Sequence, residues 1–96
     1  MKAALFLRDR QIIPNEEAII EVVIWQLPRI LPGSGHGFKY RLAFVVRGEC
    51  VLRYDNEAGK GDHKHVGHRE EPYAFIDTDT LLDDFYRDVA AWRTKK

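Results

Sequence analysis

Residues 38–55, FKYRLAFVVRGECVLRYD, hold the pattern that decides the fold of this chain. Apolar side chains alternate with polar or small ones over residues 38–46, and a period of two predicts a half-buried strand. The dipeptide Arg47-Gly48 is typical of a two-residue hairpin turn, because glycine readily takes up the positive φ that tight turns need. Residues 49–55 would be the return strand. The stretch therefore predicts an antiparallel hairpin.

The segments before this hairpin extend the predicted sheet. Residues 2–8 indicate a first strand with Leu5 and Leu7 on one side. Residues 18–27, AIIEVVIWQL, are rich in β-branched side chains and largely apolar on both faces, which is typical of a central strand. Residues 28–37 contain two prolines and three glycines and are therefore predicted to be a loop.

The C-terminal segment is predicted to be the one helix. Apolar residues recur there at helical intervals, so that one stripe can pack on a sheet: Leu81, Leu82, Phe85, Val89 and Trp92. Thr80 and Asp83 stand at capping-box spacing near its start. The expected fold is α+β, an antiparallel sheet of about four strands with one C-terminal helix packed on a face, and residues 1–96 are expected to form a single domain.

Composition limits the class of protein. Ninety-six residues can bury one small core. Fifteen basic side chains balance fifteen acidic ones, and this zero net charge argues against a protein that coats DNA. The single cysteine, Cys50, is expected in the core, and without a disulfide framework a reducing compartment is the simpler inference. No apolar run approaches the length of a membrane span, so we expect a cytoplasmic location without membrane contact.

The stretch from Arg53 to His68, RYDNEAGKGDHKHVGH, concentrates the reactive side chains. It holds three of the four histidines together with two lysines, two aspartates and three glycines. Such residues are poor material for a core, because each buried polar group needs a partner. A plain connecting loop would not need this mixture either, so the stretch is the predicted functional site.

His63 and His65 could form an acid–base pair. In an extended segment they would point the same way, about 6.5–7 Å apart, because side chains alternate at about 3.3 Å per residue. Two imidazoles at that separation can flank a phosphodiester, one removing a proton from a 2′-hydroxyl and the other protonating the leaving 5′-oxygen. Lys60, between Gly59 and Gly61, could offset charge on the phosphate, while the glycines let backbone N–H groups approach it.

Other side chains of the stretch complete the predicted site. Asp55 or Asp62 would orient an imidazole and fix its tautomer. Lys64 and Arg69 would attract a polyanion, and a tyrosine could stack on a base. The residues expected to bind substrate are Arg53, Tyr54, Asn56, Gly59, Gly61, Lys64 and Arg69.

Several interpretations compete with this one. The His-x-His pair with Asp62 or Asp55 supplies three ligands, the count of a catalytic zinc site, although no cysteine or HExxH-like helix accompanies them. The blandest alternative is a solvated, charged loop. His36 reads as an exposed histidine rather than a catalyst, although its loop could form a second basic lip facing the stretch. Trp25 and Trp92 are expected to pack in the core or between sheet and helix.

The string RYDNEAGKGDHKH, after a strand ending in CVLRYD and before EEPYAF, closely resembles the TumE family of bacterial toxins. The opening MKAALFLRDR and the segments WQLP and FKYRLAFVV are also similar to that family, so the resemblance covers most of the chain. It maps the family motif onto Tyr54, Asp55, Asn56, Gly59, Lys60, Gly61, Asp62, His63 and His65. The resemblance implies the toxin of a type II toxin–antitoxin module, neutralised by an antitoxin with a helix-turn-helix DNA-binding domain.

Small α+β toxins are commonly RNA-cleaving enzymes, and by this analogy the leading hypothesis is a metal-independent endoribonuclease without a cofactor. RNA and the cognate antitoxin are the expected partners. A homodimer is conceivable too, because an unpaired strand edge recruits another chain. The alternatives are a non-catalytic toxin that blocks a translation-related target and a metal-dependent nuclease. A nucleotidyl- or phosphotransferase has weaker support, since the run Gly59-Lys60-Gly61 is shorter than a P-loop.

Overall fold

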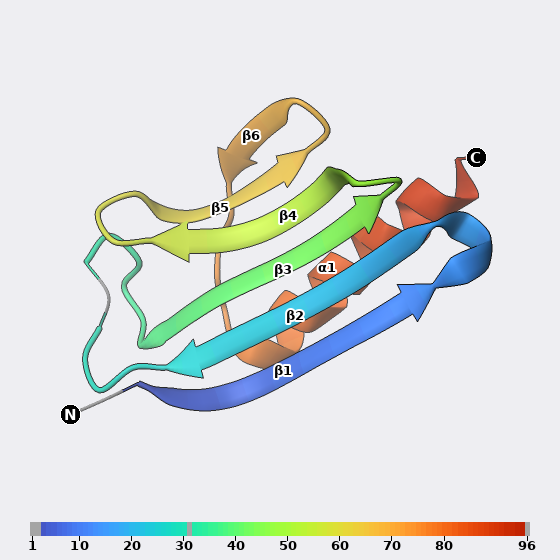
Figure 1. The fold of residues 1–96 in the computed structure, drawn as a ribbon. Helices are drawn as coiled ribbons and strands as arrows, with labels where there is room; N and C mark the ends of the chain where they lie inside the picture. Colours follow the sequence, from blue (N-terminus) through green and yellow to red (C-terminus); the bar gives the residue numbers. More distant parts are fainter. Residues whose placement is uncertain (1–2, 31, 96) are drawn as a thin grey trace.

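The computed structural model describes residues 3–30 and 32–95. The elements in chain order (Figure 1) are β1 (Ala4–Ile13), the 3-10 turn η1 (Pro14–Glu16), β2 (Ala18–Gln26), β3 (Phe38–Val46), β4 (Glu49–Glu57), β5 (Gly61–Val66), β6 (Arg69–Pro72) and α1 (Thr78–Thr94). All six strands form one antiparallel sheet in the order β1-β2-β3-β4-β5-β6, so each strand pairs with its neighbour in the sequence. The helix α1 lies across one face of this sheet (Figure 1).

The predicted α+β class and the C-terminal helix on one face are confirmed, but the prediction of about four strands is wrong. The sheet has six strands, because β5 and β6 fall in the polar stretch and just after it. Neither strand has the apolar alternation that identifies the other four. Their strand character comes from the ladder of backbone pairs that continues β4 outward. Residues 53–68, for which a solvated loop was the blandest alternative, therefore lie largely in β4 and β5.

The core lies between α1 and the face of the sheet that α1 covers, called here the helix face. Alternate residues of β2, β3 and β4 point to it, as the period of two predicts. The buried apolar side chains are Ala18, Ile20, Val22, Ile24, Tyr40, Leu42, Phe44, Val46, Leu52, Tyr54, Leu81, Phe85 and Val89. On the opposite face of the sheet, called here the open face, no helix lies within residues 3–30 and 32–95.

The helix begins one turn earlier than the predicted capping box. Asp77 is the N-cap, and its carboxylate accepts a hydrogen bond from the backbone N–H of Thr80 at 2.7 Å. The predicted stripe is confirmed, because Leu81, Phe85 and Val89 are buried and Trp92 packs against the core. Within the residues that the structure describes, no helix is long and apolar enough to cross a membrane.

Two irregularities of register overturn side-chain placements expected from simple alternation. Phe44 pairs with Leu52, whereas Val45 pairs with Cys50, so Val51 of β4 is left without a paired residue in β3. Such an extra residue turns the side chains beyond it to the other face. Cys50 is consequently exposed instead of joining Leu52 in the core, and the predicted core position is wrong.

The same effect occurs in β1, which extends to Ile13, well beyond the predicted residues 2–8. Leu5 pairs with Trp25 and Leu7 with Ile24, so the register shifts between them. The two leucines therefore lie on opposite faces, not on one side as predicted. Leu7 packs against the core, whereas Trp25 lies on the open face outside the core cluster, contrary to its predicted core position.

The hairpin turn between β3 and β4 is confirmed. Arg47 has a φ of 51° and Gly48 a φ of 78°, and two successive positive values characterise the type I′ turn that joins twisted strands. The longer loop before β3 folds back over the beginning of β5, and this contact shapes the site.

Candidate active site: a histidine pair on the open face

The strand β5 carries His63 and His65 on the open face of the sheet. His63 pairs with Asp55 of β4, and His65 pairs with Arg53. Directly opposed residues of an antiparallel pair share a face, so all four side chains lie together. The extended segment that the acid–base hypothesis required is present, and both imidazoles are on the same side of it.

These side chains line a small cavity with a volume of about 90 Å³. That is room for several waters or for a small polar group. Its lining residues are Arg53, Asp55, Glu57, Lys60, His63, His65 and Glu70. The cavity thus combines two imidazoles, two cations and three carboxylates.

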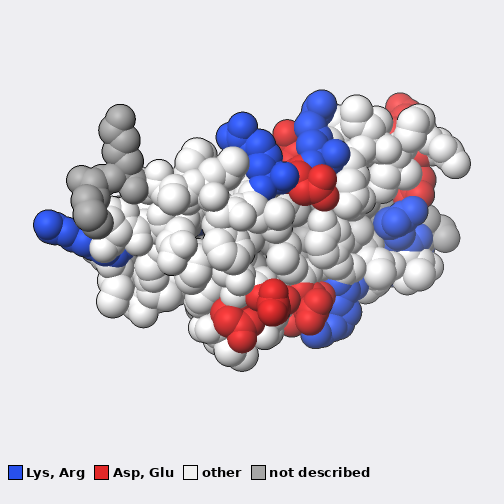
Figure 2. Space-filling model, turned by 90° about the horizontal axis from the view of Figure 1, so that it is seen from below, with Lys and Arg blue, Asp and Glu red and all other residues white. Residues whose placement is uncertain are grey.

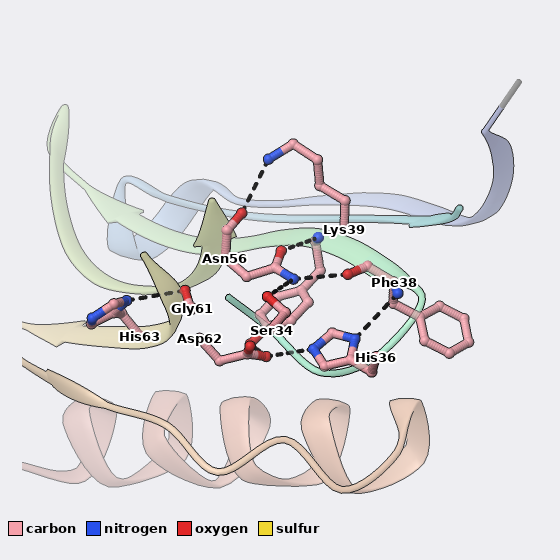
Figure 3. Close-up of polar contacts among 9 residues, drawn as sticks. Ser34, His36, Phe38, Lys39, Asn56, Gly61, Asp62 and His63 are labelled. Carbon is pink, nitrogen blue, oxygen red and sulfur yellow. Dashed lines mark hydrogen bonds and ion pairs between the residues drawn. The ribbon is translucent and has the colours of Figure 1, made fainter. Parts of the chain in front are cut away.

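His63 is held in one tautomer by the backbone. Its Nδ1 lies 3.1 Å from the carbonyl oxygen of Gly61 (Figure 3). A carbonyl only accepts hydrogen bonds, so Nδ1 carries the proton and the neutral ring keeps its lone pair on Nε2. No hydrogen-bond partner of that nitrogen occurs among the described residues, and the ring is therefore available to take a proton.

His65 meets one cation and two carboxylates through a single nitrogen. Its Nε2 lies 3.0 Å from Nη2 of Arg53, 3.3 Å from Oε2 of Glu70 and 3.9 Å from Oδ1 of Asp55. The guanidinium only donates, so the neutral ring accepts from Arg53. A protonated ring would instead donate to Glu70. The surroundings can hold His65 in either protonation state.

The two cations of the cavity differ in how they are held. Arg53 has a buried Nε that makes no hydrogen bond within the described chain, although Asp55 Oδ2 lies 3.1 Å away as an ion-pair partner. Lys60 is exposed in the β4–β5 turn, and no ion pair involves it among residues 3–30 and 32–95. The cavity accordingly has a fixed positive group and a free one.

Asp62 does not join the histidine pair. It lies on the helix face, where its Oδ2 accepts hydrogen bonds from His36 Nε2 and from the Tyr40 hydroxyl, each at 2.7 Å (Figure 3). Nδ1 of His36 accepts from the Phe38 N–H at 3.2 Å, which leaves the proton on Nε2. Burial, followed by the hydrogen bond to Asp62, raises the pKa of Tyr40 far above its ordinary value. The carboxylate orients no imidazole of the pair.

His36 is not the exposed histidine that the sequence suggested. Only 13% of its side chain is accessible, and its ring stacks on Phe75 with 3.8 Å between the ring centroids. Its loop approaches the start of β5 from the helix side instead of forming a basic lip opposite the histidine pair. His36, Asp62 and Tyr40 together anchor that loop.

Asn56 is a second anchor of the same loop. It is 1% exposed, and its side-chain oxygen accepts from the Tyr40 N–H at 2.9 Å. Its amide group donates to Ser34 Oγ at 3.1 Å and to the Phe38 carbonyl at 2.8 Å. A side chain so enclosed has no surface for a substrate.

The glycines of the motif serve loop packing. A Cβ on Gly61 would lie 2.8 Å from the carbonyl oxygen of Gly33, closer than side chains tolerate. The N–H of Gly59 donates to Pro32 and the N–H of Lys60 donates to Glu57. These two N–H groups are occupied within the protein, so the predicted anion cradle is reduced to the ammonium group of Lys60.

Three other predicted binding residues lie away from the pair. Tyr54 is buried on the helix face with its hydroxyl donating to Asp88, so it cannot stack on a base. Lys64 forms ion pairs with Asp88 at 3.2 Å and Glu71 at 3.7 Å. Arg69 is exposed and lies 3.5 Å from Glu71. All three are directed away from the cavity.

Glu70 belongs to the site but was missed from the sequence. Gly67 has a φ of 62° and turns the chain so that Glu70 of β6 pairs with His65. A glycine following an alternating segment is a hairpin signal, and it would have suggested this pairing. Among the described residues, no group of three or more His, Cys, Asp or Glu side chains converges as metal ligands do.

A family model described as Toxin TumE matches residues 2–93, nearly the whole chain. No curated protein and no solved structure matches.

Proposed function

The chain belongs to the TumE toxin family, and from this premise we propose that it is a metal-independent endoribonuclease, the toxin of a type II toxin–antitoxin module. The observation that carries the proposal is the shared cavity of His63 and His65 on the open face. Two imidazoles beside Lys60 and Arg53 supply acid, base and positive charge within one cavity. Those are the requirements for breaking a phosphodiester by internal attack.

His63 is the general base in this mechanism. Its Nε2 lone pair removes the proton of a 2′-hydroxyl, and the 2′-oxygen then attacks the adjacent phosphorus. The Gly61 carbonyl supports the step, because it holds the proton on Nδ1 and aims Nε2 outward. As the positive charge develops on the ring, that same hydrogen bond stabilises it.

His65 is the general acid. In its protonated form it gives a proton to the leaving 5′-oxygen as the bond from phosphorus to that oxygen breaks. The products are a 2′,3′-cyclic phosphate and a free 5′-hydroxyl. The protonated ring can donate to Glu70 before the step, with Asp55 also close by, and Arg53 can donate a hydrogen bond to the neutral ring after it. Arg53 and Lys60 offset the charge on the non-bridging oxygens.

Cleavage of defined RNA in the presence of EDTA tests the proposal. We expect His63→Ala and His65→Ala each to lower kcat/KM by at least about 10²-fold, the low end for one acid–base group. His68→Ala is the matched control, because His68 is exposed in the β5–β6 turn beyond the cavity lining. Its activity should equal that of the wild type.

Two other results would select the alternatives. Activity that is lost in EDTA and restored by zinc or manganese would indicate a metal-dependent nuclease. Growth arrest by the induced protein with cellular RNA left intact, and unchanged by both histidine substitutions, would indicate a non-catalytic toxin that blocks its target.

The toxin family suggests an antitoxin as partner, and we propose an antitoxin with a helix-turn-helix domain that contacts β1. This strand is an edge of the sheet, so in the part of the chain that the structure describes no strand pairs with its outer backbone groups. It also exposes Leu5, Phe6 and Ile12 by 48%, 49% and 61%. Figure 2, seen from below and hence from the β1 side, shows a largely uncharged band between clusters of charge.

An unpaired strand edge with these exposed apolar side chains near its two ends suits a partner strand. Pairing of two toxin copies through β1 is the competing use of that edge, and the oligomeric state of the free toxin distinguishes it. The proposal also includes a cytoplasmic location, where the RNA substrate would be found.

A further inference from the structure

We propose that the open face from Trp25 to His63 is a track for single-stranded RNA, in which Trp25 stacks on a base and Lys39 and Arg41 bind backbone phosphates. This inference rests on the proposed ribonuclease function and extends its site by two strands of the sheet. It concerns residues that neither the family motif nor the cavity around the histidine pair includes.

The register of the sheet puts these side chains on one face. Trp25 of β2 pairs with Lys39 of β3, and Arg41 of β3 pairs with Asp55 of β4. Asp55 in turn pairs with His63 of β5. Neighbouring strands are about 4.8 Å apart, so β2 with Trp25 lies three strand spacings, or roughly 14 Å, across the sheet from β5 with His63, the proposed general base. The track thus leads directly into the cavity.

Lys39 and Arg41, the cations along the track, have no acidic partner within the described part of the chain, which sets them apart from many other cations of the molecule. Ion pairs neutralise the basic side chains of Arg10, Arg47, Arg53, Lys64, Arg69, Arg87 and Arg93. Arg41 is exposed, and no ion pair or hydrogen bond of its side chain occurs among the described residues. The ammonium of Lys39 donates to the Asn56 carbonyl at 3.0 Å and projects from the sheet away from α1 (Figure 3).

Such unneutralised cations favour a polyanion over an acidic protein loop or a neutral ligand. Arg8 continues the row, because it pairs with Val23, which pairs with Arg41. The side chain of Arg8 forms no ion pair within residues 3–30 and 32–95. Phosphates of a strand crossing the sheet would therefore meet positive charge on β1, β3 and the β4–β5 turn.

Trp25 gives the track its preference for single strands. Its ring is half-buried on the open face and belongs to no core cluster. Trp92 differs, because it packs edge-on against Phe44 with 5.3 Å between centroids. An aromatic ring at the surface of a sheet can stack on an unpaired base, whereas the bases of a duplex are already stacked on one another.

Binding of 2′-O-methyl RNA tests the track apart from the chemistry, because this probe has no free 2′-hydroxyl and is not cleaved. The affinity of a short fluorescent probe would be measured by anisotropy at several salt concentrations. We expect Trp25→Ala to weaken binding about tenfold or more, the range for one base–aromatic stack. Trp25→Phe should restore most of the affinity.

Arg41→Gln should weaken binding and reduce the slope of log K against log salt by about 0.7, the value for one phosphate contact on a single strand. Arg87→Gln is the matched control, because Arg87 lies on α1, away from the open face, and should change neither quantity. Circular dichroism and thermal unfolding would show that each variant is folded.

Three outcomes would overturn the track. Trp25→Ala and Arg41→Gln could both bind the probe like the wild type, while His63→Ala abolishes cleavage; the ribonuclease proposal would then stand alone. Duplex RNA could bind as tightly as the single strand. The two variants could lose antitoxin binding but keep RNA binding. Loss of probe binding in both variants, together with cleavage that survives His63→Ala and His65→Ala, would support the track and remove the proposed catalytic pair.

Discussion

Asp62 and His63 are neighbours in the sequence, yet their side chains lie on opposite faces of the sheet. The strand alternation that brings His63 beside His65 turns Asp62 toward α1, where His36 and Tyr40 bind it. The family motif thus places a residue of the proposed mechanism, His63, directly beside a residue that holds the structure, Asp62. The two functions share six residues of chain because each face of β5 meets a different environment.

The first prediction concerns the His36–Asp62 anchor. His36→Ala should lower the free energy of unfolding by about 1–3 kcal/mol, because it leaves a buried carboxylate with one hydrogen-bond donor fewer. Urea unfolding measures the loss, and His68→Ala, on the surface, should stay within about 0.5 kcal/mol of the wild type. A fully stable His36→Ala protein without RNA cleavage would contradict this structural role and point to a direct one in catalysis.

Gly61 and Gly59 offer a matched pair for the second prediction. Both have a positive φ, of 80° and 84°, so alanine is strained at each by about 1–2 kcal/mol. Only at Gly61 would the new Cβ also meet Gly33, at 2.8 Å from its carbonyl oxygen. Thermal unfolding should therefore show a greater loss for Gly61→Ala than for Gly59→Ala. Equal losses would mean that the loop contact does not constrain β5.

At the residue level, the sequence predicts which side chains of a strand share a face better than it predicts which partner each side chain contacts. The pairing of His63 with His65 followed from their spacing, because alternation in a strand is regular. The roles of Asn56 and Tyr54 did not, since a polar or aromatic side chain in a motif looks the same whether it meets substrate or a buried partner. Both turned out to be 1% exposed. Only the three-dimensional placement of Ser34, Phe38 and Asp88 explains them.

Among the elements, β5 and β6 show where reasoning from hydrophobic pattern fails. A strand that bears a polar site on one face and satisfied polar groups on the other, as β5 does, contains almost no apolar signal. The bulge beside Cys50 could not be predicted from the sequence either, because one extra residue does not visibly change an otherwise regular alternation. By contrast, the hairpin of residues 38–55 and the apolar stripe of α1 could be predicted from the sequence. One face of each element is buried, and this burial produces a regular pattern of apolar side chains.

The N-cap of α1 carries the third prediction. The hydrogen bond from the Thr80 backbone lowers the pKa of Asp77 below its ordinary value. A lowered pKa in the folded state means that the stabilisation is present above the unfolded value of about 3.9 and is lost as pH falls through the folded value. Asp77→Ala should therefore unfold at a lower temperature than the wild type at pH 7, and the difference should shrink toward pH 3.

Asp77→Ser provides the control, because serine can cap the helix without a charge. Its advantage over Asp77→Ala should persist at low pH. A difference between wild type and Asp77→Ala that is independent of pH would contradict the assignment of the cap to the ionised carboxylate.

The exposed edge β1 carries the fourth prediction. Ile12→Lys should weaken the toxin–antitoxin complex at least tenfold, because it puts a charge into the proposed apolar contact, and should leave RNA cleavage unchanged. Ile76→Lys is the control, since Ile76 is 71% exposed and lies outside β1. Calorimetric titration of each variant with the antitoxin measures the effect. Equal affinities for both variants would exclude β1 as the contact.

At the scale of the whole molecule, the two faces of the six-stranded sheet carry different groups of side chains. The helix face contains the core and its polar anchors, while the open face presents the histidine pair and the unneutralised cations. The sequence was sufficient to predict the α+β class and the position of the helix, because the strongest periodicities lie in the central strands and α1. It was insufficient for the extent of the sheet, and hence for which residues of the motif share a face.

The fifth prediction tests the central claim, that His63 and His65 break RNA by moving protons to and from the 2′- and 5′-oxygens. A defined RNA and a copy with a single 2′-deoxynucleotide at the cleavage position would be treated in EDTA, and the ends identified by mass spectrometry. We predict a 2′,3′-cyclic phosphate and a 5′-hydroxyl from the RNA, and no cut at the deoxy position. Cleavage of the deoxy copy at that position, with a 5′-phosphate on the product, would contradict the account.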